Sequence, residues 1–113
     1  MKFLCIYKST KGEGAPLSQD EMSRMGSLME QMSKAGVLKG TGGCKPSSFG
    51  ARIRQASGGT VTVTDGPFND PKGIIGGYAI IETASKADAI DWSKRFLAIH
   101  GDGESEIREM FEQ

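Results

Sequence analysis

The chain has 113 residues, of which 14 are basic and 14 are acidic, so its formal net charge at pH 7 is zero. This length suffices for one core, and it predicts a single domain over residues 1–113. A neutral chain without a run of like charge has no field that attracts nucleic acid or an anionic membrane, so neither is an expected partner. The N-terminal stretch is too short and too soon polar for a signal peptide or a spanning helix, which predicts a cytoplasmic protein.

Metal and nucleotide sites are not expected either. The two cysteines, Cys5 and Cys44, and the one histidine cannot supply the usual four zinc ligands, so both thiols are expected to be reduced and without a catalytic role. The glycine cluster at residues 40–43 matches neither a phosphate-binding loop nor a dinucleotide fingerprint, and a loop or bulge is the better interpretation. No cofactor is therefore expected.

The first part of the chain predicts a strand followed by a helix. Residues 2–8 are apolar on both faces of a strand. Ser18 and Glu21 have the spacing of a capping box, and Gly36 suits the left-handed residue after a helix, so a helix is expected from Gln19 to Ala35. Its apolar stripe has the spacing of a core face, with an adaptable binding surface as the alternative, and comprises Met22, Met25, Leu28, Met29 and Met32.

A hairpin is expected in the middle of the chain. Residues 51–55 and 60–64 have the composition of strands, and Ser57-Gly58-Gly59 marks the turn between them. Arg52 and Arg54 would share one face with the threonines, where solvation is favoured over ligand binding. The other face would carry Ile53, Val61 and Val63.

The remaining elements complete a recognisable order. Residues 74–82 form the strongest strand, again apolar on both faces, Ser85 caps a second helix, and residues 105–111 predict a last strand. Strand, helix, strand, hairpin, strand, helix, strand is the order of a ferredoxin-like α+β sandwich with an inserted β-hairpin. Two helices can cover only one face of such a sheet, so a homodimer is expected, sheet against sheet, with a barrel-like interior.

The sequence Asp65-Gly66-Pro67-Phe68, directly after the second hairpin strand, is the most informative stretch. The glycine and the proline restrict this corner, so the carboxylate of Asp65 is presented in few orientations and is the candidate catalytic group. Turn chemistry alone favours the simpler interpretation that Asp65 caps its own turn.

In a cleft between two sheets, such a carboxylate could transfer a proton to or from a small organic ligand. Candidate ligand-binding residues are Tyr7, Arg52, Arg54, Tyr78 and His100. Among these, His100 precedes Gly101-Asp102 and is expected to be a solvated loop residue that is dispensable for function.

Several separated motifs indicate a family. They are Met1 to Tyr7, Glu21 to Leu38 with Ala35-Gly36-Val37-Leu38 at its end, Pro46-Ser47-Ser48, Val63 to Phe68, Ile75-Gly76-Gly77-Tyr78 and Glu106-Ile107-Arg108. With these motifs in this order, the chain resembles the DGPF proteins of the YCII-related family over nearly its whole length. The resemblance implies a dimeric α/β barrel of the ferredoxin-like type.

The resemblance implies less about function. The family is suspected of catalysis through a His and Asp pair whose histidine lies on the first helix, but residues 18–35 contain no histidine here. That pair cannot be carried over as it stands. Similar members also occur beside, or fused to, sigma factors of the extracytoplasmic-function type, which implies a non-catalytic regulatory protein with a protein partner as the alternative.

Overall fold

The structure is a computed structural model that describes residues 1–10, 12–13, 16–70 and 73–112. A short 3-10 helix spans Ser47–Phe49. In chain order the other elements are β1 (Lys2–Ser9), α1 (Gln19–Lys34), β2 (Leu38–Gly43), β3 (Ala51–Gln55), β4 (Val61–Asp65), β5 (Ile74–Glu82), α2 (Lys86–His100) and β6 (Gly103–Glu109).

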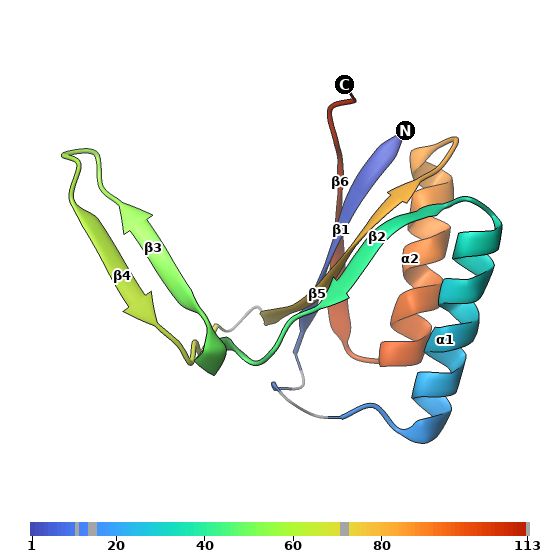
Figure 1. The fold of residues 1–113 in the computed structure, drawn as a ribbon, viewed down its shortest axis with the longest axis horizontal. Coiled ribbons are helices and arrows are strands. Elements are labelled where there is room, and N and C mark those ends of the chain that lie inside the picture. The colour runs from blue at the N-terminus through green and yellow to red at the C-terminus, as the bar shows by residue number, and fades with distance from the viewer. Residues whose placement is uncertain (11, 14–15, 71–72, 113) are drawn as a thin grey trace.

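The main sheet has four strands in the order β2-β5-β1-β6, and each neighbouring pair is antiparallel. Both helices lie on one face of this sheet, while β3 and β4 form a separate hairpin that projects away from it (Figure 1). The fold is therefore the predicted ferredoxin-like α+β sandwich with an inserted hairpin.

The core lies between the main sheet and the helices. Phe3 on β1 and Ile81 on β5 are opposite each other in register and are each 1% exposed. The other buried members of this core are Leu28, Met32 and Ala89.

The methionine stripe of α1 is only partly core. Its capping box and its glycine after the helix, Gly36 with φ 71°, are as predicted. Met32 is buried, Met25 and Met29 are half-buried, and Met22 is 58% exposed. The interpretation of the whole stripe as core is wrong at Met22, because this residue lies in the first turn, beyond the part of α1 that is packed against the sheet.

Of the two alternatives for the glycine cluster, a loop is wrong, because β2 continues through it to Gly43, whereas a bulge agrees with the register shift at its start. Its pairing with β5 shows one irregularity, between Leu38 and Gly40. At Gly42 an added Cβ would lie 2.9 Å from the ring of Tyr78, so a glycine lets this ring lie directly against the strand.

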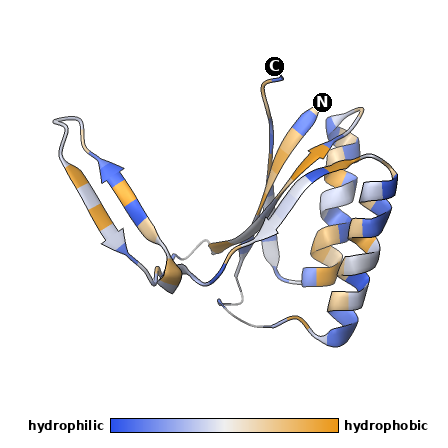
Figure 2. Ribbon diagram, viewed as in Figure 1, coloured by the Kyte–Doolittle hydropathy of each residue, from blue (hydrophilic) through white to orange (hydrophobic). Residues whose placement is uncertain are grey.

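The face of the main sheet opposite the helices is apolar. Leu4 pairs with Ile80, and Ile6 pairs with Tyr78, on the side that alternates with Phe3 and the core. Three of these four side chains are half-exposed and Tyr78 is 44% exposed. We call these four residues the open face; Figure 2 shows that the central strands are largely hydrophobic. The sequence-based expectation of strands that are apolar on both sides is confirmed.

The hairpin, residues 51–65, is here called the arm. Its register pairs Arg52 with Thr64 and Arg54 with Thr62, so the arginines share a face with these threonines as expected. Ile53 pairs with Val63 on the opposite face. All residues of β3 and β4 are exposed.

The base of the arm is held by a dense set of contacts. Ser47, which is 7% exposed, donates from its amide and from its hydroxyl to the two carboxylate oxygens of Glu13, each at 2.5 Å. The hydroxyl of Ser47 also accepts a hydrogen bond from the amide of Phe68 at 2.9 Å, and the amide of Gly66 donates to the carbonyl of Gly50 at 3.0 Å. The two ends of the arm are therefore tied to each other and to the body.

Arg52 adds an ion pair at the same base. Its guanidinium lies 3.9 Å from the ring centroid of Phe68 and donates to both carboxylate oxygens of Asp70, with Nη1 to Oδ1 at 3.0 Å. The hydrogen bond from Arg52 lowers the pKa of Asp70 below its ordinary value. Arg52 therefore serves the fold of this chain, and its donors are directed at a loop of the same chain.

The Arg52 and Asp70 pair should be visible in an acid titration. Because the folded-state pKa of Asp70 is lowered, the pair stabilises the fold above the ordinary aspartate pKa of about 3.9 and loses this effect as the pH falls through the lowered value. An NMR titration of the Asp70 carboxyl carbon is expected to give a midpoint below the ordinary aspartate value of about 3.9, because the hydrogen bond from Arg52 stabilises the charged carboxylate. In Arg52→Ala this midpoint should rise; an unchanged midpoint would show that the pair does not form.

Candidate functional site

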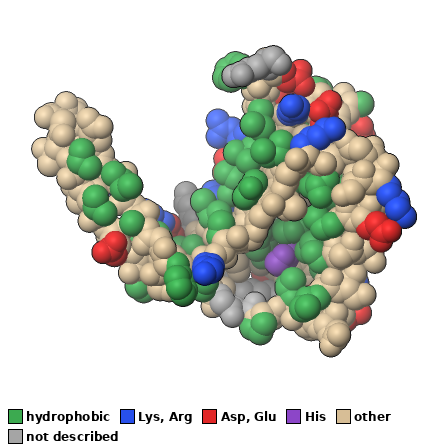
Figure 3. Space-filling view, in the orientation of Figure 1, with side chains coloured by type: hydrophobic (Ala, Val, Ile, Leu, Met, Phe, Trp, Pro, Cys, Tyr) green, Lys and Arg blue, Asp and Glu red, His purple; other side chains and the backbone are tan. Residues whose placement is uncertain are grey.

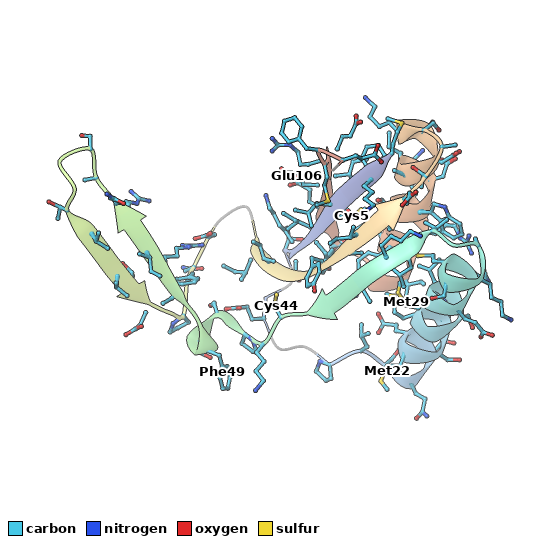
Figure 4. All side chains as sticks on the ribbon, turned by 45° about the horizontal axis from the view of Figure 1, so that its top comes forward. Cys5, Met22, Met29, Cys44, Phe49 and Glu106 are labelled. Carbon is cyan, nitrogen blue, oxygen red and sulfur yellow. The ribbon has the colours of Figure 1, made fainter. Side chains whose placement is uncertain are left out.

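A cavity of about 270 Å³ lies between the main sheet and the two helices. We call it the apolar cavity, because its floor and walls are formed mainly by apolar side chains and glycine backbone. Figure 4 labels two of its lining residues, Cys5 on β1 and Met29 on α1. The other lining residues are Tyr7, Met25, Thr41, Gly42, Gly43, Gly76, Gly77, Tyr78, Ala79, Ser93, Phe96, His100 and Ser105.

Three rings pack together at one end of this cavity. The ring centroid of Tyr7 lies 5.3 Å from that of Phe96 and 4.6 Å from that of His100, and Phe96 and His100 are also 4.6 Å apart. Tyr7 is 8% exposed, and its hydroxyl donates to the carbonyl of Asp102 at 3.3 Å. We call these three residues the ring cluster. In Figure 3 the histidine side chain is recessed among hydrophobic groups.

The expectation that His100 is a solvated loop residue is wrong. His100 is the last residue of α2, which continues until Gly101, with φ 83°, caps it. The imidazole is half-buried against the ring cluster. Ser93, Phe96 and His100 follow one another at spacings of three and four, so they lie on one face of α2. From this spacing in the sequence, His100 could have been predicted to lie on the same face of the helix as Ser93 and Phe96 and to line the cavity with them.

A second cavity, of about 290 Å³, adjoins the first. Tyr7, Gly76 and His100 line both, so the ring cluster lies at their junction. The second cavity is more polar, because Ser9, Glu13, Glu21 and Lys45 contribute to its wall. We call it the polar cavity.

Cys5 is the one thiol in the apolar cavity, where it is hydrogen-bonded to Ser93. Burial raises the pKa of the Cys5 thiol, and the hydrogen bond with Ser93 offsets this only in part. A raised pKa favours the protonated thiol, which is a poor nucleophile. Cys5 therefore serves the cavity as a small apolar side chain.

The other candidate residues are distributed over three places. Asp65 is the last residue of β4; it is exposed, pairs with Ala51, and is absent from the walls of both cavities. Arg52 is held by Asp70 at the base of the arm, and Arg54 lies exposed on the same face of the arm. Tyr78 belongs to the open face and borders the apolar cavity. Only Tyr7, Tyr78 and His100 of the six candidates line a cavity together.

Within residues 1–10, 12–13, 16–70 and 73–112, no group of three or more His, Cys, Asp and Glu side chains could hold a metal ion. No helix in the same part of the chain is long and apolar enough to cross a membrane.

Comparisons with known proteins agree with this fold. The sequence model of the YCII-related domain matches residues 1–112, so the chain belongs to the YCII-related family. A comparison with curated proteins gives no match.

Among solved structures, the chain is similar to 5-chloro-2-hydroxyhydroquinone dehydrochlorinase from Burkholderia phenoliruptrix, in a complex with 2,5-dihydroxybenzoquinone. The TM-score is 0.52 with 14% sequence identity, and the match covers 100% of this chain and 96% of the other. At this identity the likeness concerns the fold alone.

Proposed function

We propose that this protein binds a small, flat, oxygen-substituted ring in the apolar cavity and exchanges a proton with it through the ring cluster. The observation that carries the proposal is that a tyrosine and a histidine lie together, with ring centroids 4.6 Å apart, at one end of a mainly apolar cavity. Small-molecule sites are characteristically apolar pockets with a few polar groups that fix the orientation of the ligand. The dehydrochlorinase of the same fold, which binds a dihydroxybenzoquinone, supports this class of ligand.

The size of the cavity supports a single ring. A volume of about 270 Å³ lies just below the 300–1,000 Å³ that is roughly typical of sites for drug-sized ligands. The side chains of Met25 and Met29 lie on one side, and thioethers make favourable contacts with aromatic rings. Phe96 offers a further ring surface at the junction.

The chemistry follows from the two polar groups. The hydroxyl of Tyr7 donates its one proton to the carbonyl of Asp102, so it can accept a hydrogen bond from a hydroxyl of the ligand, or donate to a ligand oxygen that takes the place of that carbonyl. The imidazole of His100, 4.6 Å from Tyr7 between ring centroids, can take a proton from an acidic hydroxyl of the ligand and return it to a carbon or an oxygen. Such a proton exchange is the step shared by isomerisations and eliminations on hydroxylated rings.

The proposal departs from the sequence-based expectation in one respect. The sequence names Asp65 as the candidate catalytic residue, yet Asp65 does not line either cavity of this chain. A catalytic role for Asp65 stays a prediction, and it would require a binding site that includes residues of another chain. The regulatory alternative, with a sigma-factor partner, also stays a prediction.

A binding experiment tests the proposed function. With 2,5-dihydroxybenzoquinone as the probe, isothermal titration calorimetry is expected to give a Kd below about 1 mM, and Tyr7→Phe and His100→Ala should each weaken binding by about tenfold, or roughly 1.4 kcal/mol. Asp65→Asn serves as the discriminating variant and should bind like the native protein.

Three outcomes would contradict the proposal. They are no heat of binding at millimolar probe, native affinity in both ring-cluster variants, or selective loss in Asp65→Asn. The last would return the site to the carboxylate. The melting temperature of each variant shows whether a loss of binding is a loss of fold.

A further inference from the structure

The polar cavity and the apolar cavity meet beside the ring of Tyr7. Tyr7, Gly76 and His100 line both of them. An added Cβ at Gly76 would lie 3.1 Å from the ring of Tyr7, so this glycine leaves room beside the ring that a larger residue would fill. The two cavities have similar volumes, about 270 and 290 Å³. A ring in the apolar cavity can therefore extend a substituent past Tyr7 into the polar cavity.

The wall of the polar cavity carries two charges of opposite sign. Glu13 and Lys45 both line this cavity, and neither of them forms an ion pair with another described residue. Glu21 lines it as well, but its Oε1 accepts a hydrogen bond from the amide of Ser18 at 3.0 Å in the capping box of α1. Glu13 and Lys45 are therefore the charged groups that can recognise charges of a ligand.

The carboxylate of Glu13 is fixed in place by one residue. Its two oxygens accept hydrogen bonds from the amide and the hydroxyl of Ser47, each at 2.5 Å, and Ser47 is buried. A serine is neutral, so it leaves the negative charge of Glu13 without a counter-charge. A carboxylate also offers about four acceptor sites, so further sites remain beside the two bonds to Ser47. Glu13 can therefore accept hydrogen bonds from an ammonium group.

The ammonium group of Lys45 belongs to the same segment. Lys45 follows Cys44, another wall residue of the polar cavity, which Figure 4 labels just beyond the end of β2. Its Nζ lies 5.2 Å from the ring centroid of Phe49, an attraction that orients the cation. Pro46 alone separates Lys45 from Ser47, the anchor of Glu13. An ammonium group offers only donors, so Lys45 suits a carboxylate of the ligand.

We propose that the ligand of this protein is a hydroxylated aromatic amino acid, with its ring in the apolar cavity and its amino acid head group in the polar cavity. At neutral pH this head group carries an ammonium and a carboxylate, which complement Glu13 and Lys45. The inference rests on the proposed function, because the ring cluster places the ring. A ligand with only one of the two charges leaves either Glu13 or Lys45 without a counter-charge.

The expected contribution of each charge is modest. Glu13 and Lys45 are both exposed on the solvent side of the cavity. Ion pairs that water can reach contribute about 0.2–1 kcal/mol each. Each of the two contacts should therefore change the affinity about threefold, and both together about tenfold.

A set of probes with the same catechol ring separates the two charges. L-Dihydroxyphenylalanine carries both, dopamine only the ammonium, dihydroxyphenylpropionate only the carboxylate, and methylcatechol neither. In calorimetric titrations, dihydroxyphenylalanine should bind about threefold more tightly than dopamine or dihydroxyphenylpropionate, and about tenfold more tightly than methylcatechol. A titration of 2,5-dihydroxybenzoquinone alongside them tests the proposed function by itself.

Variants assign each charge to its residue. Lys45→Met removes the cation, so the preference for dihydroxyphenylalanine over dopamine should disappear. Glu13→Gln removes the negative charge, so the preference over dihydroxyphenylpropionate should disappear; its melting temperature shows whether the bonds to Ser47 persist, and Lys45→Met keeps the test decisive if they do not. Lys94→Met is the matched control, because Lys94 is exposed on α2 and lies outside the walls of both cavities. It should keep both preferences.

The outcomes separate this proposal from the proposed function. Equal affinity for the whole catechol series, or binding of the quinone without binding of dihydroxyphenylalanine, would overturn the amino acid ligand and leave the ring site standing. Preferences that survive in Lys45→Met, or that Lys94→Met loses as well, would also overturn it. If neither the quinone nor any catechol binds, the proposed function fails and the amino acid ligand fails with it.

Discussion

Replacing Gly66 with alanine is expected to destabilise the protein by about 3 kcal/mol, near the upper end of the usual cost of overpacking. The added Cβ would lie 1.8 Å from the carbonyl oxygen and 2.6 Å from the carbonyl carbon of Ser47, and backbone atoms cannot turn aside as a side chain can. The strain would reach the hydrogen bond from the amide of Phe68 to the hydroxyl of Ser47. Urea denaturation followed by circular dichroism measures the loss of stability.

Gly58→Ala is the matched control. Gly58 lies in the turn of the arm, where an added Cβ would have no atom within 4 Å. The free energy of unfolding of the Gly58→Ala variant should therefore stay within about 0.5 kcal/mol of the native value. Equal losses in both variants would mean that the cost arises from the backbone freedom of glycine and not from the contact with Ser47.

The importance of Gly66 also changes how the Asp65 to Phe68 stretch is understood. The sequence alone predicts that the glycine and the proline serve to present Asp65. In the structure, Gly66 and Phe68 both contact Ser47, which is distant in the chain and buried. A local motif that is held by a remote serine cannot be interpreted from its own residues, because turn propensities describe only neighbours in sequence.

The fold could be predicted because its signals are local. Ser18 and Glu21 form the capping box, Gly36 takes the positive φ, and the alternation of apolar residues in β1 and β5 places two strands in the centre of the sheet. Each of these features depends on residues within one element. The order of the elements then restricts the topology to one familiar arrangement.

The site could be predicted only in part, because it depends on contacts between elements. Tyr7 and His100 are 93 positions apart in the chain, and their contact exists because β1 and the end of α2 meet at one end of the sandwich. A glycine after His100 indicated a loop, yet the helix uses that glycine as its cap. Helix ends are the least certain part of a sequence-based assignment, and here the error placed His100, although a candidate for ligand binding, on a solvated loop and not on a face of α2.

Filling the apolar cavity should abolish the binding of the ring while the fold persists. Ser93 lines the cavity from α2, and Ser93→Phe would place a ring inside the space of about 270 Å³ that the proposed ligand occupies. Because the new side chain enters a void, its apolar contacts offset the lost hydrogen bond to Cys5. Affinity for 2,5-dihydroxybenzoquinone should fall on the order of 100-fold, or roughly 2.7 kcal/mol, by calorimetric titration.

Ala98→Phe provides the comparison, since it adds the same ring to an exposed position of the same helix. It should leave both the affinity and the melting temperature close to those of the native protein. If Ser93→Phe keeps its melting temperature and still binds the probe as the native chain does, the ring is bound outside the apolar cavity. Asp65, which lies outside the walls of both cavities, would then become the first place to search for the site.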